Sequence, residues 1–128
     1  MASILKVDSM QGVTSAGDIT ITSEGGSTTM QLQQGLAKAW AKCSADGTSI
    51  NDSFNISSLA DDGTALQTLS LTSSMSDTAY PGLSTSIDST CILVLDSHAT
   101  GSYRTVSRNN AGILTDAITQ SALKGDLA

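Results

Sequence analysis

The side chains that could do chemistry in this chain are few. It has one histidine, His98, and two cysteines, Cys43 and Cys91. These three side chains cannot complete a four-ligand zinc site, and the cysteines are not in C-x-x-C spacing. The sequence also lacks the G-x-S-x-G turn of serine hydrolases and the Gly-rich loops that bind phosphates. Because a catalytic centre needs convergent groups with tuned proton affinities, the sequence predicts no enzyme, no metal and no cofactor.

Two other patterns could bind a ligand. The carboxylates of Asp61 and Asp62 could hold calcium, although we favour a turn in which they accept hydrogen bonds from backbone N–H groups. The only tryptophan, Trp40, stands between Lys38 and Lys42. An exposed Trp40 could stack on the sugar rings of a glycan. We favour its packing against a neighbouring subunit, with the stems of Lys38 and Lys42 beside it.

The segment that positions Trp40 has two interpretations. Apolar residues recur at helical spacing from 32 to 43, but residues 37–43 also alternate as a strand does, with small residues on one side and Lys38, Trp40 and Lys42 on the other. A helix would contain Gly35 at a cost of about 1 kcal/mol. We therefore favour the strand.

Charge and hydropathy exclude several classes of partner. The net charge is −6, and the six basic residues are scattered, whereas a nucleic-acid interface needs clustered Lys and Arg. We expect no nucleic acid. No apolar run approaches 18 residues, so we expect no membrane span. The N-terminus does not resemble a secretory signal, so we expect both thiols to be reduced and unpaired.

The chain divides into two regions of different texture. Residues 1–35 hold apolar stretches too short to bury themselves, so this region is predicted to be an extended arm whose order comes from other chains. Residues 36–128 have turn signals every 8–15 residues and few charges, which is typical of an all-β domain. The apolar side chains expected to anchor the arm are Ile4, Leu5, Val7, Ile19 and Ile21.

The predicted fold class is all-β, a compact antiparallel β-sandwich or barrel-like knob with an extended N-terminal arm. Strands are expected over 53–59, with Phe54 and Ile56 in phase, over 66–75, and over 103–108. A further strand over 89–97 is expected to be buried on both faces. The segment from 113 to 128 fits either a helix or a closing strand. With so few aromatic residues, part of the core is expected to be shared between chains.

Several motifs resemble a module of bacteriophage virion proteins. The segments are QGLAKAWAKC, DSFNISSLADDGT, TSSMSDTAY and the terminal LKGDLA. Proteins with this module occur in marine and cyanobacterial phages and are often described as tail fibres. The resemblance covers residues 36–128 and is weaker over 1–35. This sequence departs from the pattern at Cys43, where the family often has an aromatic residue, and its DDGTA turn lacks a second glycine.

The resemblance implies a structural component of a phage particle. It implies a homotrimeric surface knob held by its arm to capsid or tail proteins, in a virion assembled in the cytoplasm of the bacterial host. The knob would be either a head-decoration (cement) protein or a short tail fibre. The alternative is a small soluble carbohydrate-binding module that recognises a host surface glycan through Trp40.

Overall fold

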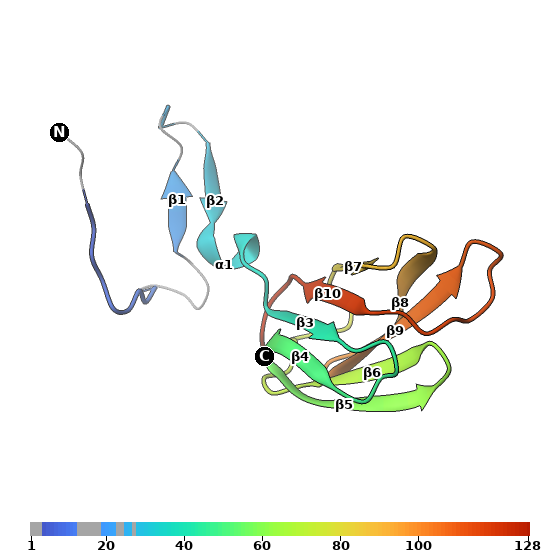
Figure 1. Ribbon diagram of the computed structural model, residues 1–128. Helices are drawn as coiled ribbons and strands as arrows, with labels where there is room; N and C mark the ends of the chain where they lie inside the picture. Colours follow the sequence, from blue (N-terminus) through green and yellow to red (C-terminus); the bar gives the residue numbers. More distant parts are fainter. Residues whose placement is uncertain (1–3, 13–18, 23–24, 27) are drawn as a thin grey trace. The chain divides into compact units, whose positions relative to one another are not determined.

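The computed structural model describes residues 4–12, 19–22, 25–26 and 28–128 (Figure 1). Contacts divide the chain into two units, Met1–Leu36 and Ala37–Ala128. In the first unit, strands β1 (Thr20–Thr22) and β2 (Thr29–Gln31) form an antiparallel hairpin with Ile21 opposite Met30. The short helix α1 (Leu32–Gly35) follows.

The anchor residues expected in the arm lie at the surface of this first unit. Ile4 and Leu5 are each 78% exposed, and Val7 and Ile21 are also exposed. Ile19 is half-buried, and its carbonyl accepts a hydrogen bond of 2.7 Å from the backbone N–H of Leu32. Most of the large apolar side chains described in this unit are therefore exposed to water.

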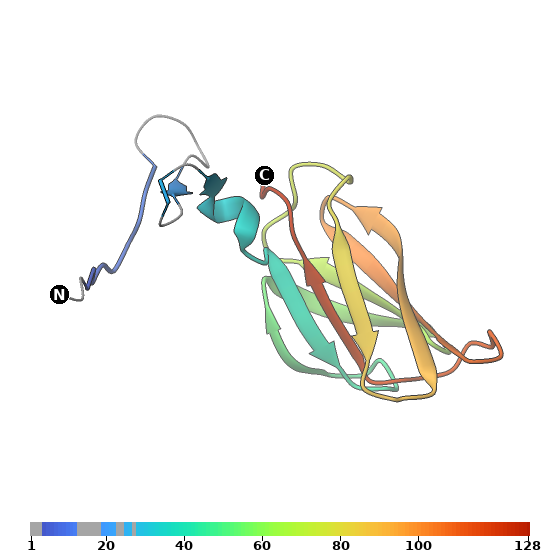
Figure 2. The same cartoon turned by 90° about the horizontal axis from the view of Figure 1, so that it is seen from above.

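The second unit is a sandwich of two four-stranded antiparallel sheets, ordered β4-β3-β10-β7 and β5-β6-β9-β8. In Figure 2 the teal, red and yellow strands β3, β10 and β7 lie side by side over the other sheet. The predicted all-β class and antiparallel sandwich are confirmed. The strands are β3 (Ala39–Cys43), β4 (Ile50–Phe54), β5 (Ile56–Gly63), β6 (Leu66–Leu71), β7 (Gly82–Ser86), β8 (Cys91–Ala99), β9 (Ser102–Asn109) and β10 (Thr119–Leu123).

The core lies between the two sheets and combines small and large side chains. On β6 and just beyond it, Leu69, Leu71 and Met75 are buried. Tyr103 is also buried, and its hydroxyl lies 2.7 Å from Ser121 Oγ. Burial raises the pKa of Tyr103 to about 12, so this pair stays neutral and hydrogen-bonded across the sandwich at physiological pH.

Both ambiguous segments form strands. Residues 39–43 are β3, and within residues 32–43 helix is limited to the four residues of α1. The segment after residue 113 contains β10, which lies between β3 and β7. The β context therefore prevails over the helical spacing in both places.

Two predicted strands differ from those observed. The strand expected over 53–59 is broken at Asn55, which has a φ of 59°, and the chain passes there from one sheet to the other. Phe54 is consequently exposed rather than in phase with Ile56. The prediction that residues 89–97 are buried on both faces is wrong, because β8 is an edge strand that leaves Ile92 and Val94 exposed.

Candidate functional site

Four apolar side chains form a row across the outer face of the β4-β3-β10-β7 sheet. Trp40 lies opposite Phe54 on one side and Ala122 on the other, and Ala122 lies opposite Leu83. The exposed fractions are 53% for Phe54, 37% for Trp40 and 67% for Leu83. We call these four residues the apolar row. Side chains directly opposite each other on one face of a sheet lie about 5 Å apart, so the row is continuous.

The sequence places these side chains outside because the inner positions of β3 are small. Ala39, Ala41 and Cys43 are almost completely buried and alternate with Trp40. The strand therefore gives only small side chains to the core and presents its one large apolar side chain on the outer face. Both tyrosines are buried, whereas the only Trp and the only Phe of the chain lie side by side on the outer face.

A polar row runs beside the apolar row on the same face. Asp52 lies opposite Lys42, Lys42 opposite Gln120, and Gln120 opposite Thr85. The acid and the base stand on adjacent strands, where opposite charges stabilise a sheet. The two rows therefore have no net formal charge, although the chain as a whole has −6.

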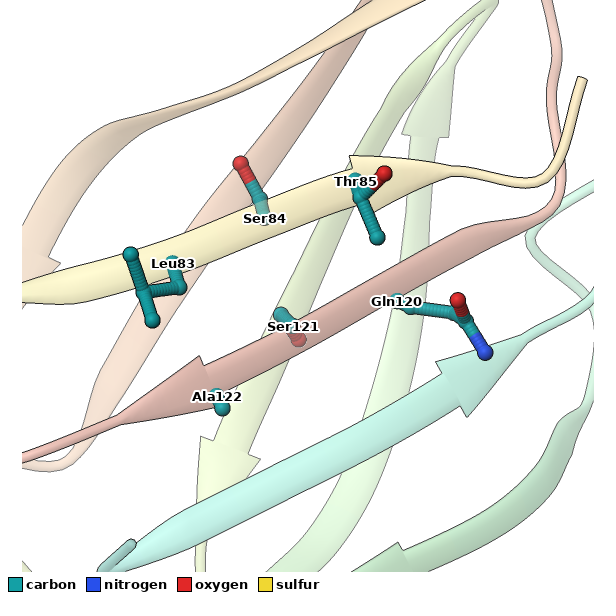
Figure 3. A pocket seen from close by; sticks show the side chains of 6 residues that line it. All are labelled: Leu83, Ser84, Thr85, Gln120, Ser121 and Ala122. Carbon is teal, nitrogen blue, oxygen red and sulfur yellow. The ribbon is translucent and has the colours of Figure 1, made fainter. Parts of the chain in front are cut away.

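A hollow of about 210 Å³ opens on this face over strands β7 and β10. Ala122 explains the hollow, because a methyl group stands there between the much larger side chains of Trp40 and Leu83. Figure 3 shows the six residues that line it on the two adjacent strands. These are Leu83, Ser84, Thr85, Gln120, Ser121 and Ala122.

The structure separates the three residues predicted as a contact surface. Trp40 and Lys42 lie in neighbouring rows of the outer face, but Lys38 is only 8% exposed. Lys38 precedes β3. Its backbone N–H donates to Leu123 O at 2.8 Å, and its carbonyl accepts from Asn55 Nδ2 at 3.0 Å. The alternation used for the prediction applies only inside a strand, so the placement of Lys38 on the outer face is wrong.

Sequence reasoning also missed residues of this face. Phe54 was predicted to be in phase with Ile56 on a single strand over 53–59, and residues 82–86 were not recognised as a strand, so Leu83 had no assigned position. A signal for the strand was present, since Leu83, Thr85 and Ile87 alternate with small residues. Ile87 and Ile118 are exposed where β7 and β10 meet, and Ile87 N–H donates to Ile118 O at 3.3 Å.

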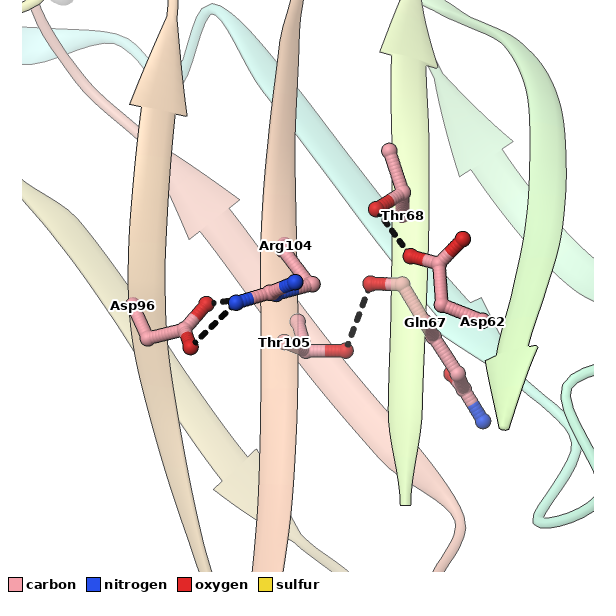
Figure 4. A network of polar contacts seen from close by, with 6 residues as sticks. All are labelled: Asp62, Gln67, Thr68, Asp96, Arg104 and Thr105. Carbon is pink, nitrogen blue, oxygen red and sulfur yellow. Dashed lines mark hydrogen bonds and ion pairs between the residues drawn. The ribbon is translucent and has the colours of Figure 1, made fainter. Parts of the chain in front are cut away.

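The outer face of the other sheet is built around polar pairs (Figure 4). Arg104 donates to both carboxylate oxygens of Asp96, at 2.9 and 2.8 Å, and Thr68 donates to Asp62 at 2.5 Å. The hydrogen bond from Arg104 lowers the pKa of Asp96. These side chains find their partners within the same chain.

The residues considered for catalysis or metal binding do not converge. His98 lies at the exposed end of β8 rather than in a turn, with its ring centroid 4.8 Å from that of Tyr80. Cys43 and Cys91 are both free, and burial raises the pKa of the Cys43 thiol. Asp61 and Asp62 lie at the end of β5, and the turn follows at residues 64–65. Asp61 Oδ1 accepts from Gly63 N–H at 2.9 Å, as expected, whereas Asp62 accepts from the hydroxyl of Thr68. In the described part of the chain, no three His, Cys, Asp or Glu side chains are grouped to hold a metal.

The chain matches no protein-family model, and no curated protein or solved structure is detectably similar to it. The resemblance to phage virion proteins therefore stays a prediction. Among the described residues, no helix has the length and apolar character needed to cross a bilayer.

Proposed function

We propose that this chain is a structural protein of a bacteriophage particle, assembled in the cytoplasm of the bacterial host. In this proposal residues 37–128 form a homotrimeric surface knob, and the N-terminal unit attaches the knob to capsid or tail proteins. The proposal covers two positions on the particle, a head-decoration (cement) protein and a short tail fibre. The protein acts in it by binding, and none of its residues is assigned a catalytic role.

The observation that supports this proposal best is the apolar row. A small acidic domain that works alone in water gains solubility by keeping large apolar side chains inside. Here the only Trp and the only Phe are outside, next to each other and in line with Leu83. Such a face indicates a domain that works while covered by protein, as the subunits of a particle do.

The N-terminal unit supports the attachment step. Ile4, Leu5 and Val7 are exposed within one short extended stretch. Each such side chain contributes roughly 1.5–3 kcal/mol when it is fully buried. Three copies of the stretch in a trimer would bind together, because attachment of the first raises the effective concentration of the others.

A second candidate function is a carbohydrate-binding module for a host surface glycan. It is favoured by the pairing of Trp40 with Phe54 beside the polar side chains of Lys42 and Gln120. Aromatic faces stack on sugar rings, and the neighbouring polar groups could bond to sugar hydroxyls. This candidate needs the face to stay open, whereas the first needs it covered.

Quantitative mass spectrometry of gradient-purified particles tests the first proposal. The particles come from the phage whose genome encodes the chain, and we expect the chain at tens to hundreds of copies per particle. Particles that are infectious and lack the chain would contradict the proposal.

A second arm of the experiment tests attachment. Full-length chain with Ile4, Leu5 and Val7 all changed to Ser is offered to particles that lack the native protein. The matched control changes the interspersed polar residues Lys6 and Asp8 to Ala. We expect the apolar variant to lose at least about tenfold in occupancy, the equivalent of 1.4 kcal/mol, and the control to bind like the native chain. Equal occupancy of both variants would show that the contact lies elsewhere.

A further inference from the structure

We propose that copies of this chain pack together through the outer face of the β4-β3-β10-β7 sheet, with Phe54 of one copy entering the hollow beside Trp40 of the next. The inference rests on the proposed function only for the number of copies, three. The identity of the contacting residues comes from the geometry of the face.

The face has a projecting side chain at one edge. Phe54 ends β4, the edge strand of its sheet, and is 53% exposed. Its only neighbour across the sheet in the apolar row is Trp40. A phenyl ring in this position can reach a second molecule without any change in the backbone.

The same face has a depression near the other edge. The hollow lies over β10 and β7, where its lining includes Leu83 and Ala122 of the apolar row and Thr85 and Gln120 of the polar row. Trp40 lies opposite Ala122, on the side of the hollow away from Leu83. Adjacent strands are about 4.8 Å apart, so three strand intervals place Phe54 roughly 14 Å from Leu83 along the row. Phe54 therefore cannot fill the hollow of its own chain, but it can fill that of another copy.

Charge favours a second copy as the occupant. Two molecules of net charge −6 repel each other unless they meet on a neutral surface. The polar row provides one acid and one base, Asp52 and Lys42, and its other members are uncharged. Copies can thus approach through this face, and the ring of Phe54 suits a hollow bounded by Leu83 and Ala122 better than a hydroxyl-rich sugar does.

Phe54 and the hollow are different parts of one face, so the proposed contact is between unlike surfaces. Repeated around a threefold axis, each copy gives its Phe54 to one neighbour and receives the Phe54 of the other. A twofold arrangement would use the same residue pair reciprocally and would stop at two chains. The residue pair and the number of chains can therefore be tested separately.

Cysteine cross-linking tests the contact in the full-length chain. The test variant is Phe54→Cys with Leu83→Cys, in a Cys91→Ser background that leaves only buried Cys43. Copper phenanthroline in air supplies the oxidant. The matched control is Ala60→Cys with Ser97→Cys, because these positions also lie three strand intervals apart, in one row on the other outer face. Either single cysteine variant can form at most a linked pair.

We expect the test variant to give covalent trimers and the control to stay at the mass of one chain. Covalent dimers alone would support the contact through this face and contradict the trimer of the proposed function. If the test variant links no more than the control, the inferred contact is wrong, whatever the result for purified particles.

Trp40 gives an independent readout without new cysteines. Because it is the only tryptophan, acrylamide quenching reports directly on this face. We expect Phe54→Ser to leave the melting temperature of the diluted protein nearly unchanged and to increase quenching several-fold at concentrations where the native chain associates. Unchanged quenching and mass would overturn the inference. The inference would also be overturned if the chain does not associate and its Trp40 emission changes when a soluble glucose hexasaccharide is added. That result would show that the face binds a sugar.

Discussion

The two outer faces of the sandwich differ in the kind of side chain that they expose and in how those side chains are paired. On the β5-β6-β9-β8 sheet, Arg104 is held by Asp96 and Thr68 by Asp62. On the β4-β3-β10-β7 sheet, Phe54 and Leu83 lie at the two ends of a row and project into solvent. On the first face these polar groups are paired within the chain, beside the exposed aliphatic side chains of Ile92 and Val94, whereas the second face exposes aromatic side chains as well as Leu83.

This difference is the reason why we propose a partner for the face of the β4-β3-β10-β7 sheet. An isolated exposed leucine is ordinary on a protein surface, and the exposed Ile92 and Val94 of β8 are a modest aliphatic example. A tryptophan paired with a phenylalanine is less ordinary in a chain with only four aromatic residues. Aromatic side chains are also the residues that most often dominate binding energy at interfaces.

Asn55 joins the two sheets that carry the two outer faces. Of the substitutions considered, we expect its replacement to lower the free energy of unfolding most. Its Nδ2 donates to the carbonyls of Lys38 and Ser73, both at 3.0 Å, and its Oδ1 accepts from Ser73 N–H at 2.7 Å. Its φ of 59° is also unfavourable for alanine. We expect Asn55→Ala to lower the free energy of unfolding by about 2–4 kcal/mol, measured by urea denaturation.

Asn55→Gly is the matched control. Glycine accepts the positive φ but makes no side-chain hydrogen bonds, so we expect it to recover about 1 kcal/mol of the loss. If the alanine and glycine variants are equally stable, the backbone conformation contributes nothing and only the hydrogen bonds matter. If neither variant is destabilised, Asn55 does not hold the junction between the two faces.

The same residue shows how far the sequence could predict this fold. Alternation identified β3, β6 and β9 because each stays within one sheet. It failed over 53–59, where the left-handed turn at Asn55 resets the phase and moves the chain to the other sheet. Asparagine is one of the few residues that adopt this conformation readily, so a hint was present, but no local pattern says that the flanking strands part.

The candidate site was predictable only in part. Trp40 and Lys42 were found because both lie inside β3. The neighbours of Trp40 on the sheet, Phe54 and Ala122, come from strands 14 and 82 residues away in sequence, and pairing at that distance is set by the packed fold. The hollow could not be foreseen, since it depends on a small residue between two large ones on three different strands.

A substitution at Gly82 tests the packing between the two sheets at the edge where β7 and β8 approach each other. A Cβ added at Gly82 would overlap Leu95 Cδ1 and lie 3.1 Å from Leu123 Cδ2. We expect Gly82→Ala to destabilise the fold by about 1–3 kcal/mol, as overpacking usually does. The measurement is again the urea midpoint, with the outer faces left untouched.

The matched double variant is Gly82→Ala with Leu95→Ala. Removing most of the Leu95 side chain makes room for the new methyl group, so the double variant should be more stable than the sum of the two single changes predicts. Strict additivity would show that the two sheets adjust independently at this edge.

The smallest effect is expected from the ion pair on the polar face. Asp96 and Arg104 are about one-third exposed, and ion pairs in such positions contribute ~0.2–1 kcal/mol, so Asp96→Asn should lower stability only slightly at pH 7.

The pKa of Asp96 is lowered mainly by the hydrogen bond from Arg104. The contribution of the ion pair to stability is therefore complete above the unfolded pKa of about 3.9 and disappears as the pH falls through the lower pKa of the folded state.

Arg104→Lys keeps the charge but loses the bidentate contact, so its stability should be closer to that of Asp96→Asn than to that of the native chain. If the native chain and Asp96→Asn still differ in stability well below pH 3, the carboxylate is not the source of the difference, and the polar face owes its order to the neighbouring Thr68–Asp62 hydrogen bond and to packing.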